Sequence, residues 1–239
     1  MKPTLLPLAI LVATLAFVLS PLLVSDFNGF STTAFPVPQD DPPVQPAGYA
    51  FSIWGVIYLW LIVSAVWGLW RAPAGTVHDA MRWPLLVSLG IGVFWLAAAV
   101  ASPVLAVAMI SVMAAAAIMA VLRAAEQDVW LQRRPVALYA GWLTAATGVG
   151  LGVVLGGYGV LSSQSAAILC LVGVLVVALA VQTARPREWG YPVALVWALI
   201  GVIVANASGP NWPVVALAGV GIIALIARGL FALKQGAKA

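Results

Sequence analysis

Three aromatic side chains at helical spacing are the residues of this chain whose types and positions point most directly to a chemistry. Phe51, Trp54 and Tyr58 follow an i, i+3, i+7 pattern, so they share one face of a helix. A phenyl ring, an indole and a phenol make a wall for a flat, largely apolar molecule, whose polar edge the N–H and O–H groups could bind. The alternative interpretation is that these side chains face lipid or lie at the membrane interface.

The residues on which most enzymes depend are scarce. The chain has one histidine, His78, and one cysteine, Cys170. General acid–base and metal chemistry use clusters of histidine, carboxylate or cysteine side chains. His78 is expected with Asp79 in a solvated loop, and a lone cysteine gives neither a disulfide framework nor a cysteine metal site. We therefore expect no catalytic residue, no metal and no cofactor, so the protein is not expected to be an enzyme.

Composition places these residues in a membrane. Of the 239 residues, 64% are hydrophobic and 8% charged, which leaves too few polar side chains to cover a water-soluble globule. Charge-free windows should mark the spans, because a charge at the bilayer centre costs about 2.5–3.5 kcal/mol. The windows are 3–25, 42–70, 83–122, 135–184 and 189–227. At about 20 residues per crossing, the last three must each fold back, which predicts an all-α, polytopic transmembrane bundle of eight helices.

Turn signals and charge support this count. Turn-forming residues lie at Ser102 and Pro103, at 156–163 and at 206–213. With eight spans, all eleven lysine and arginine residues fall on one side, and the other side carries only Asp26, Asp40 and Asp41. The positive-inside rule then places both termini in the cytoplasm, with the protein in the bacterial inner membrane. The net charge of +4 reflects this orientation, and we expect no nucleic-acid partner.

Two other segments have a predicted role. Residues 26–45 include four prolines and form either an ordered cap or a flexible connector. Gly148, Gly152 and Gly156 in the fifth helix are small-xxx-small pairs that let two helix backbones approach closely. Packing within the chain is the favoured use of these pairs, and a homodimer interface is the alternative.

Three motifs resemble those of the TspO/MBR family, the tryptophan-rich sensory and translocator proteins. Residues 46–51 (PAGYAF), followed by the W-x-x-x-Y pattern from Trp54 to Tyr58, resemble the second-helix signature of that family. Trp95 and residues 138–142 (LYAGW) match further motifs in the same order. The resemblance covers about residues 1–158, which would form a five-helix TspO/MBR-like domain. Residues 159–239 would be an additional three-helix transmembrane extension.

The resemblance implies an integral membrane protein that binds, and could transport, a flat hydrophobic ligand such as a porphyrin or a sterol. Porphyrin photodegradation is a further activity that only the resemblance implies. The sequence departs from the family pattern at Gly92 and Gly150, where asparagine is expected, and is one residue shorter between Phe51 and Trp54. Carried onto matching positions, the ligand-binding residues would be Pro46, Phe51, Trp54, Tyr58, Trp95, Tyr139 and Trp142.

Two alternatives come from other functional classes. A secondary transporter usually has an ionisable residue or an unwound helix at mid-membrane, and the charge-free windows contain no such residue. A structural membrane protein could use its three additional helices to dock a partner. The expected partners are therefore the lipid bilayer, a small hydrophobic ligand and, as an alternative use of the glycines, a second copy of the chain.

Overall fold

All secondary structure in the computed structural model is helical, over the residues that it describes: 4–24, 29–71, 77–209 and 211–236. Eight helices in these ranges are long and apolar enough to cross a membrane, as the sequence predicts, and they imply a bilayer environment. The α-helices are α1 (Leu5–Leu19), α2 (Ile53–Trp70), α3 (Asp79–Ala101), α4 (Pro103–Leu122), α5 (Arg134–Gly157), α6 (Ser163–Ala184), α7 (Gly190–Ala207) and α8 (Trp212–Gly236). Short helical turns are η1 (Ser20–Leu22), η2 (Thr32–Ala34), η3 (Gly48–Ser52) and the π-helical η5 (Val129–Arg133).

Each of the three predicted turns separates two helices. The α3–α4 turn is sharp because Pro103 begins α4, and Ser102 Oγ accepts a hydrogen bond from the backbone N–H of Leu105 at 3.3 Å. Ser162 caps α6 in the same way, with its Oγ 3.1 Å from Ser165 N. These caps satisfy backbone donors that a helix start leaves without partners.

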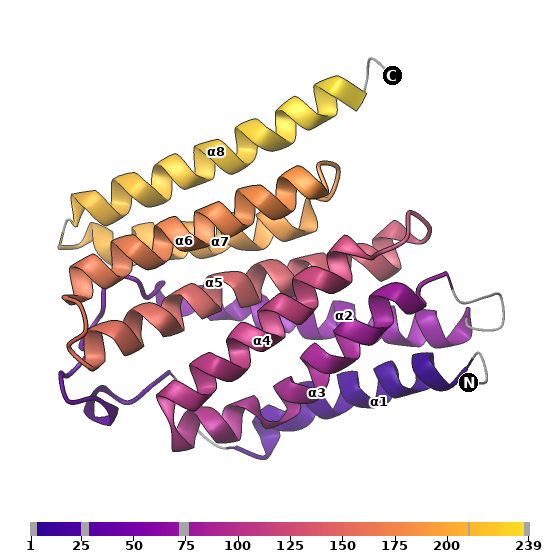
Figure 1. The fold of residues 1–239 in the computed structure, drawn as a ribbon, viewed down its shortest axis with the longest axis horizontal. Helices are drawn as coiled ribbons and strands as arrows, with labels where there is room; N and C mark the ends of the chain where they lie inside the picture. Colours follow the sequence, from indigo (N-terminus) through magenta and orange to yellow (C-terminus); the bar gives the residue numbers. More distant parts are fainter. Residues whose placement is uncertain (1–3, 25–28, 72–76, 210, 237–239) are drawn as a thin grey trace.

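Helix α5 lies in the middle of the bundle (Figure 1), with α1–α3 to one side and α6–α8 to the other. Its glycines explain the close packing. A Cβ at Gly141 would lie 2.3 Å from the carbonyl oxygen of Tyr191 in α7, and one at Gly148 would lie 2.3 Å from Val174 Cγ2 in α6. Only glycine permits these approaches. The predicted internal use of the fifth-helix glycines is therefore confirmed at Gly148, whereas a homodimer stays a prediction.

The two ends of the bundle carry charges of opposite sign. Helices α1, α3, α5 and α7 begin, and α2, α4, α6 and α8 end, at the right of Figure 1. The described lysines and arginines lie near this end, which we call the basic end, whereas Asp40 and Asp41 belong to the segment that covers the opposite end. Lys2, Asp26 and Lys238 lie outside the described residues.

Several groups at the basic end are buried, which corrects the expectation of solvated loops. His78 is only 5% exposed, and Arg82 lies in the first turn of α3 rather than before that helix. Arg82 donates hydrogen bonds to Asp79 Oδ1 at 3.0 Å and to the Gly68 carbonyl at 3.1 Å. The sequence window began after Arg82 because arginine is costly in a membrane. These hydrogen bonds satisfy the guanidinium group and allow its burial.

Candidate ligand-binding site

An apolar cavity lies beneath residues 29–46, at the end of the bundle opposite the basic end. Its enclosed volume is about 110 Å³, within about 970 Å³ of unfilled space that includes the open mouth. The enclosed part is smaller than the roughly 300–1,000 Å³ of a typical small-molecule site. A flat ligand larger than a few water molecules therefore requires side chains or the cap to move.

Residues 29–47 form an ordered cap over this cavity, which agrees with the first of the two sequence alternatives. The backbone N–H of Val37 donates to the Gly157 carbonyl at 2.9 Å, and that of Ala47 donates to the Gly201 carbonyl at 3.0 Å. Asn206 Nδ2 donates to the Pro43 carbonyl at 2.9 Å. These contacts attach the cap to α5 and α7, and Val44 within the cap is buried, at 2% exposed.

Four of the seven sequence-predicted residues line the cavity: Pro46, Phe51, Trp95 and Trp142. Phe51 packs edge-on against Trp142, with ring centroids 5.9 Å apart. Phe51 is 44% exposed, whereas Trp142 is 2% exposed. The cavity therefore has an exposed phenyl ring at its surface and a buried indole behind it.

Trp54, Tyr58 and Tyr139 are not part of the cavity lining and instead pack around Phe17 of α1. The Phe17 ring lies 5.9 Å from Trp54, 5.5 Å from Tyr58 and 5.8 Å from Tyr139, measured between ring centroids. Trp54 also lies 6.2 Å from Trp142, so the two aromatic groups are continuous. Ligand contact at any of the seven residues stays a prediction.

Gly92 explains how Phe17 reaches this position. A Cβ at Gly92 would lie 2.8 Å from the Phe17 ring. The side chain expected there from the family pattern would occupy the same space, so the glycine and the buried phenylalanine belong together. Sequence reasoning missed Phe17 because nothing in the first helix distinguishes it from a lipid-facing residue.

The hydrogen-bonding groups of the site differ in their availability. Trp95 Nε1 donates to the Ala106 carbonyl at 2.9 Å, and the Tyr139 hydroxyl lies 3.0 Å from the Ser88 hydroxyl. Trp142 Nε1 is buried and has no hydrogen-bond partner among the residues that the structure describes. A buried donor without a partner costs about 1–3 kcal/mol. Trp142 therefore brings an unsatisfied donor to the lining of an apolar cavity.

Helices α6 and α7 supply a large part of the wall, which the sequence reasoning did not foresee. The lining residues from these helices are Cys170, Leu171, Val174, Leu195, Ala198, Leu199 and Val202. Trp197 of α7 holds η3, the turn before α2, because its Nε1 donates to the Ala50 carbonyl at 2.8 Å and its ring packs edge-on against Tyr49. Trp197 is thus a packing residue.

Comparison with protein families decides the affiliation of the chain, since a family model described as "TSPO-like protein" matches residues 6–231. The chain belongs to the TSPO-like family. The match continues past residue 158 and covers most of α8, so it includes the helices that complete the cavity wall. The division into 1–158 and 159–239 stays a prediction. No curated protein and no solved structure matches the chain.

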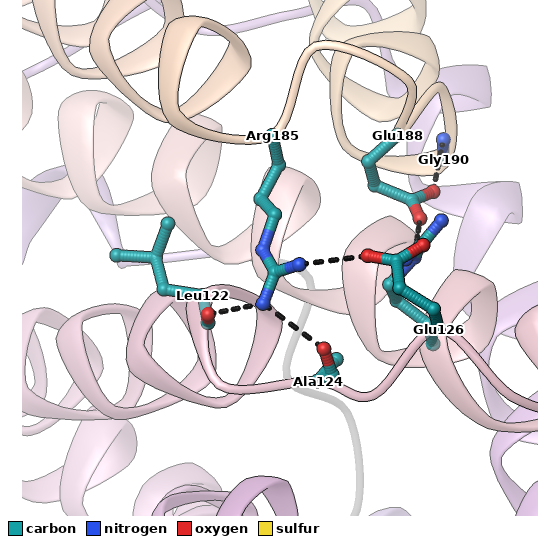
Figure 2. A network of polar contacts seen from close by, with 7 residues as sticks. Leu122, Ala124, Glu126, Arg185, Glu188 and Gly190 are labelled. Carbon is teal, nitrogen blue, oxygen red and sulfur yellow. Dashed lines mark hydrogen bonds and ion pairs between the residues drawn. The ribbon is translucent and has the colours of Figure 1, made fainter.

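The basic end of this TSPO-like protein contains an ion-pair network that joins the α4–α5 and α6–α7 connections. Figure 2 shows Arg185 donating to the carbonyls of Leu122 and Ala124 and to Glu126. Arg133 lies 2.6 Å from Glu188 Oε2 and 2.7 Å from Glu126 Oε2. Glu188 also accepts from the backbone N–H of Gly190 at 2.9 Å. The network therefore ties the two arginine-rich connections together.

Stability of the TSPO-like protein is expected to decrease as pH falls, through His78. Burial, followed by the nearby Arg82 charge, lowers the pKa of His78, although Asp128 at 3.5 Å opposes this shift. The unfolded chain, in which His78 titrates near pH 6.5, then binds the proton more readily than the folded chain. The contribution of His78 to the free energy of unfolding is therefore fully present above about pH 6.5 and is lost as the pH falls through the lowered pKa.

Denaturant midpoints measured across this pH range test the prediction. His78→Gln should remove the change between neutral pH and the lowered pKa, since glutamine does not titrate. Arg133 lowers the pKa of Glu126 by hydrogen bonding, and that carboxylate titrates below its ordinary value of 4.5, in a more acidic range. A variant with the same pH profile as the wild type would contradict the assignment to His78.

Proposed function

We propose that this TSPO-like membrane protein binds a flat hydrophobic ligand, such as a porphyrin or a sterol, in the cavity beneath residues 29–46. The observation that carries the proposal is the buried Trp142 Nε1–H, which has no hydrogen-bond partner in the described part of the chain and belongs to an apolar lining. A ligand with one acceptor atom would satisfy this donor, while its apolar faces would contact Leu195 and Leu199 of α7.

Ligand entry would involve the cap and Phe51. The enclosed volume of about 110 Å³ is too small for a tetrapyrrole, so the cavity must open on binding. Phe51 is the exposed member of the aromatic set, and rotation of its ring away from Trp142 would widen the mouth. The hydrogen bonds of Val37 and Ala47 to α5 and α7 would keep the remainder of the cap in place. Transport of the ligand through the same opening is an extension of this proposal.

We further propose that both termini are cytoplasmic and that the protein resides in the bacterial inner membrane. The support is the gathering of the described basic residues at one end of the bundle, combined with the positive-inside rule. In this orientation, the cavity and its cap lie toward the outer side of the membrane. Ligand would then enter from that side or from the outer leaflet.

Titration of the detergent-purified protein with protoporphyrin IX tests the binding proposal. We expect a saturable shift of the porphyrin absorbance band, and an affinity about tenfold weaker in Trp142→Phe, because one hydrogen bond of about 1.5 kcal/mol is lost. Trp212→Phe is the matched control, since Trp212 is 68% exposed and does not line the cavity. Equal affinities in Trp142→Phe and the wild type would contradict the role of the indole donor.

A further inference from the structure

A second apolar depression runs between α7 and α8 at the basic end and is distinct from the cavity. The depression has a volume of about 530 Å³, within about 1150 Å³ of unfilled space that includes its open side. Its walls are formed by Val193, Val196 and Ile200 of α7 and by Ile226, Leu230 and Leu233 of α8. Val193, Ile226 and Leu233 are 46%, 50% and 65% exposed. The groove is therefore open on its side and, within a membrane, faces lipid.

The length of the groove matches one leaflet of a bilayer. Its α7 wall runs from Trp189 to Ile200, which is about 16 Å at 1.5 Å per helical residue. The hydrocarbon layer is roughly 30 Å thick, so one leaflet is about half of that. An acyl chain lying along the groove would extend from the membrane interface to near the bilayer centre.

Two arginines near the interfacial end of the groove form no direct ion pair with a carboxylate of the described residues. Arg187 lines the groove, is exposed, and has no hydrogen bond or ion pair within the described part of the chain. Arg228 precedes the groove residue Gly229, and its one hydrogen bond among the described residues is to Thr183 Oγ1, at 3.4 Å. Glu188 also lines the groove, but its carboxylate is already paired with Arg133. The mouth of the groove is thus complementary to an anion.

Gln182 provides an independent indication of a ligand. It lines the groove, is 3% exposed, and uses its Nε2 to donate to the Leu225 carbonyl at 2.9 Å. Its Oε1 is buried and accepts no hydrogen bond from any described residue. Such an acceptor costs about 1–3 kcal/mol unless a donor reaches it. Gln182 and Thr183 belong to the same last turns of α6, so this acceptor and the Arg228 contact lie at the same level of the bundle.

We propose that this groove binds one anionic glycerophospholipid whose headgroup carries a hydroxyl, such as phosphatidylglycerol. One acyl chain lies between α7 and α8, and the phosphate lies between Arg187 and Arg228. A headgroup hydroxyl donates to Gln182 Oε1. Basic pockets between transmembrane helices are known to select anionic lipids by this combination of charge and apolar contact. The site is separate from the ligand cavity and does not depend on the proposed function.

Native mass spectrometry of the delipidated full chain tests the proposal. The probes are phosphatidylglycerol and phosphatidylcholine with identical acyl chains. We expect one phosphatidylglycerol molecule per chain, bound about 10- to 30-fold more tightly than phosphatidylcholine, because two arginines contact its phosphate. Equal retention of the two lipids, or retention of neither, would overturn the proposal.

Three variants locate the site. Arg187→Gln combined with Arg228→Gln should abolish the preference for phosphatidylglycerol, whereas Arg123→Gln, an exposed arginine at the end of α4, should keep it. Gly229→Leu should weaken the binding of both lipids by filling the groove, where a Cβ would meet only Gln182 Nε2, at 3.5 Å. Unchanged far-UV circular dichroism spectra and thermal midpoints would show that the variants remain folded. A dimer that dissociates in Gly229→Leu, with no lipid retained by the wild type, would assign the groove to a second copy and overturn the lipid proposal.

Discussion

Arg133→Met is expected to lower the free energy of unfolding by about 3–5 kcal/mol, because it leaves a buried carboxylate without its counter-charge. Glu188 is 3% exposed, and Arg133 Nε lies 2.6 Å from its Oε2. The second partner of Arg133, Glu126, is largely exposed and can turn to water. The cost of the substitution therefore comes from Glu188, whose remaining hydrogen bond among the described residues is from the backbone N–H of Gly190.

Reversible unfolding in mixed micelles measures this effect. Arg123→Met is the matched control and should change stability by less than about 0.5 kcal/mol, since Arg123 is exposed. Glu188→Gln added to Arg133→Met should recover part of the loss by removing the buried charge. A single variant Arg133→Met that is as stable as the wild type would show that the network does not hold the two connections together.

Gly141→Ala is expected to destabilise the protein by about 1–3 kcal/mol through overpacking. The new Cβ would lie 2.3 Å from the Tyr191 carbonyl oxygen and 3.0 Å from Ala194 Cβ. The first of these atoms is backbone, so α5 and α7 must separate to admit the methyl group. Their separation would also move Leu195 and Leu199, and we expect weaker porphyrin binding in the same variant.

Gly173→Ala in α6 is the matched control for this substitution. A Cβ at Gly173 would meet no atom within 4 Å, so the substitution should be neutral or stabilising by up to about 1 kcal/mol, the gain in helix propensity. Denaturant midpoints of both variants give the comparison. A similar stability of Gly141→Ala and Gly173→Ala would contradict the close approach of α5 and α7.

The number and the turns of the helices could be predicted because each depends on local chemistry. Charge is excluded from the membrane interior. Proline favours the first position of a helix, and Pro103 follows the capping residue Ser102 there. The burial of His78 and Arg82 could not be predicted in this way. It depends on partners such as Asp128 and Gly68, which are distant in sequence from His78 and Arg82 respectively.

The candidate site could be predicted only in part, for a related reason. Helical spacing places Trp54 and Tyr58 on one face, and in the structure their ring centroids are 5.1 Å apart. Spacing does not reveal that Phe17 fills the space beside them, since that contact requires Gly92 on another helix. The part played by α7 was missed because its apolar residues resemble those of any membrane span.

Chemical protection of Cys170 tests most directly whether ligand occupies the cavity beneath residues 29–46. Cys170 is the only cysteine of the chain, lines the cavity and is 8% exposed. Its rate of reaction with a membrane-permeant maleimide is measured with and without protoporphyrin IX. With ligand at ten times its dissociation constant, mass action predicts labelling that is about tenfold slower. An unchanged labelling rate under conditions where the porphyrin absorbance shift is saturated would place the ligand elsewhere and contradict the proposed site.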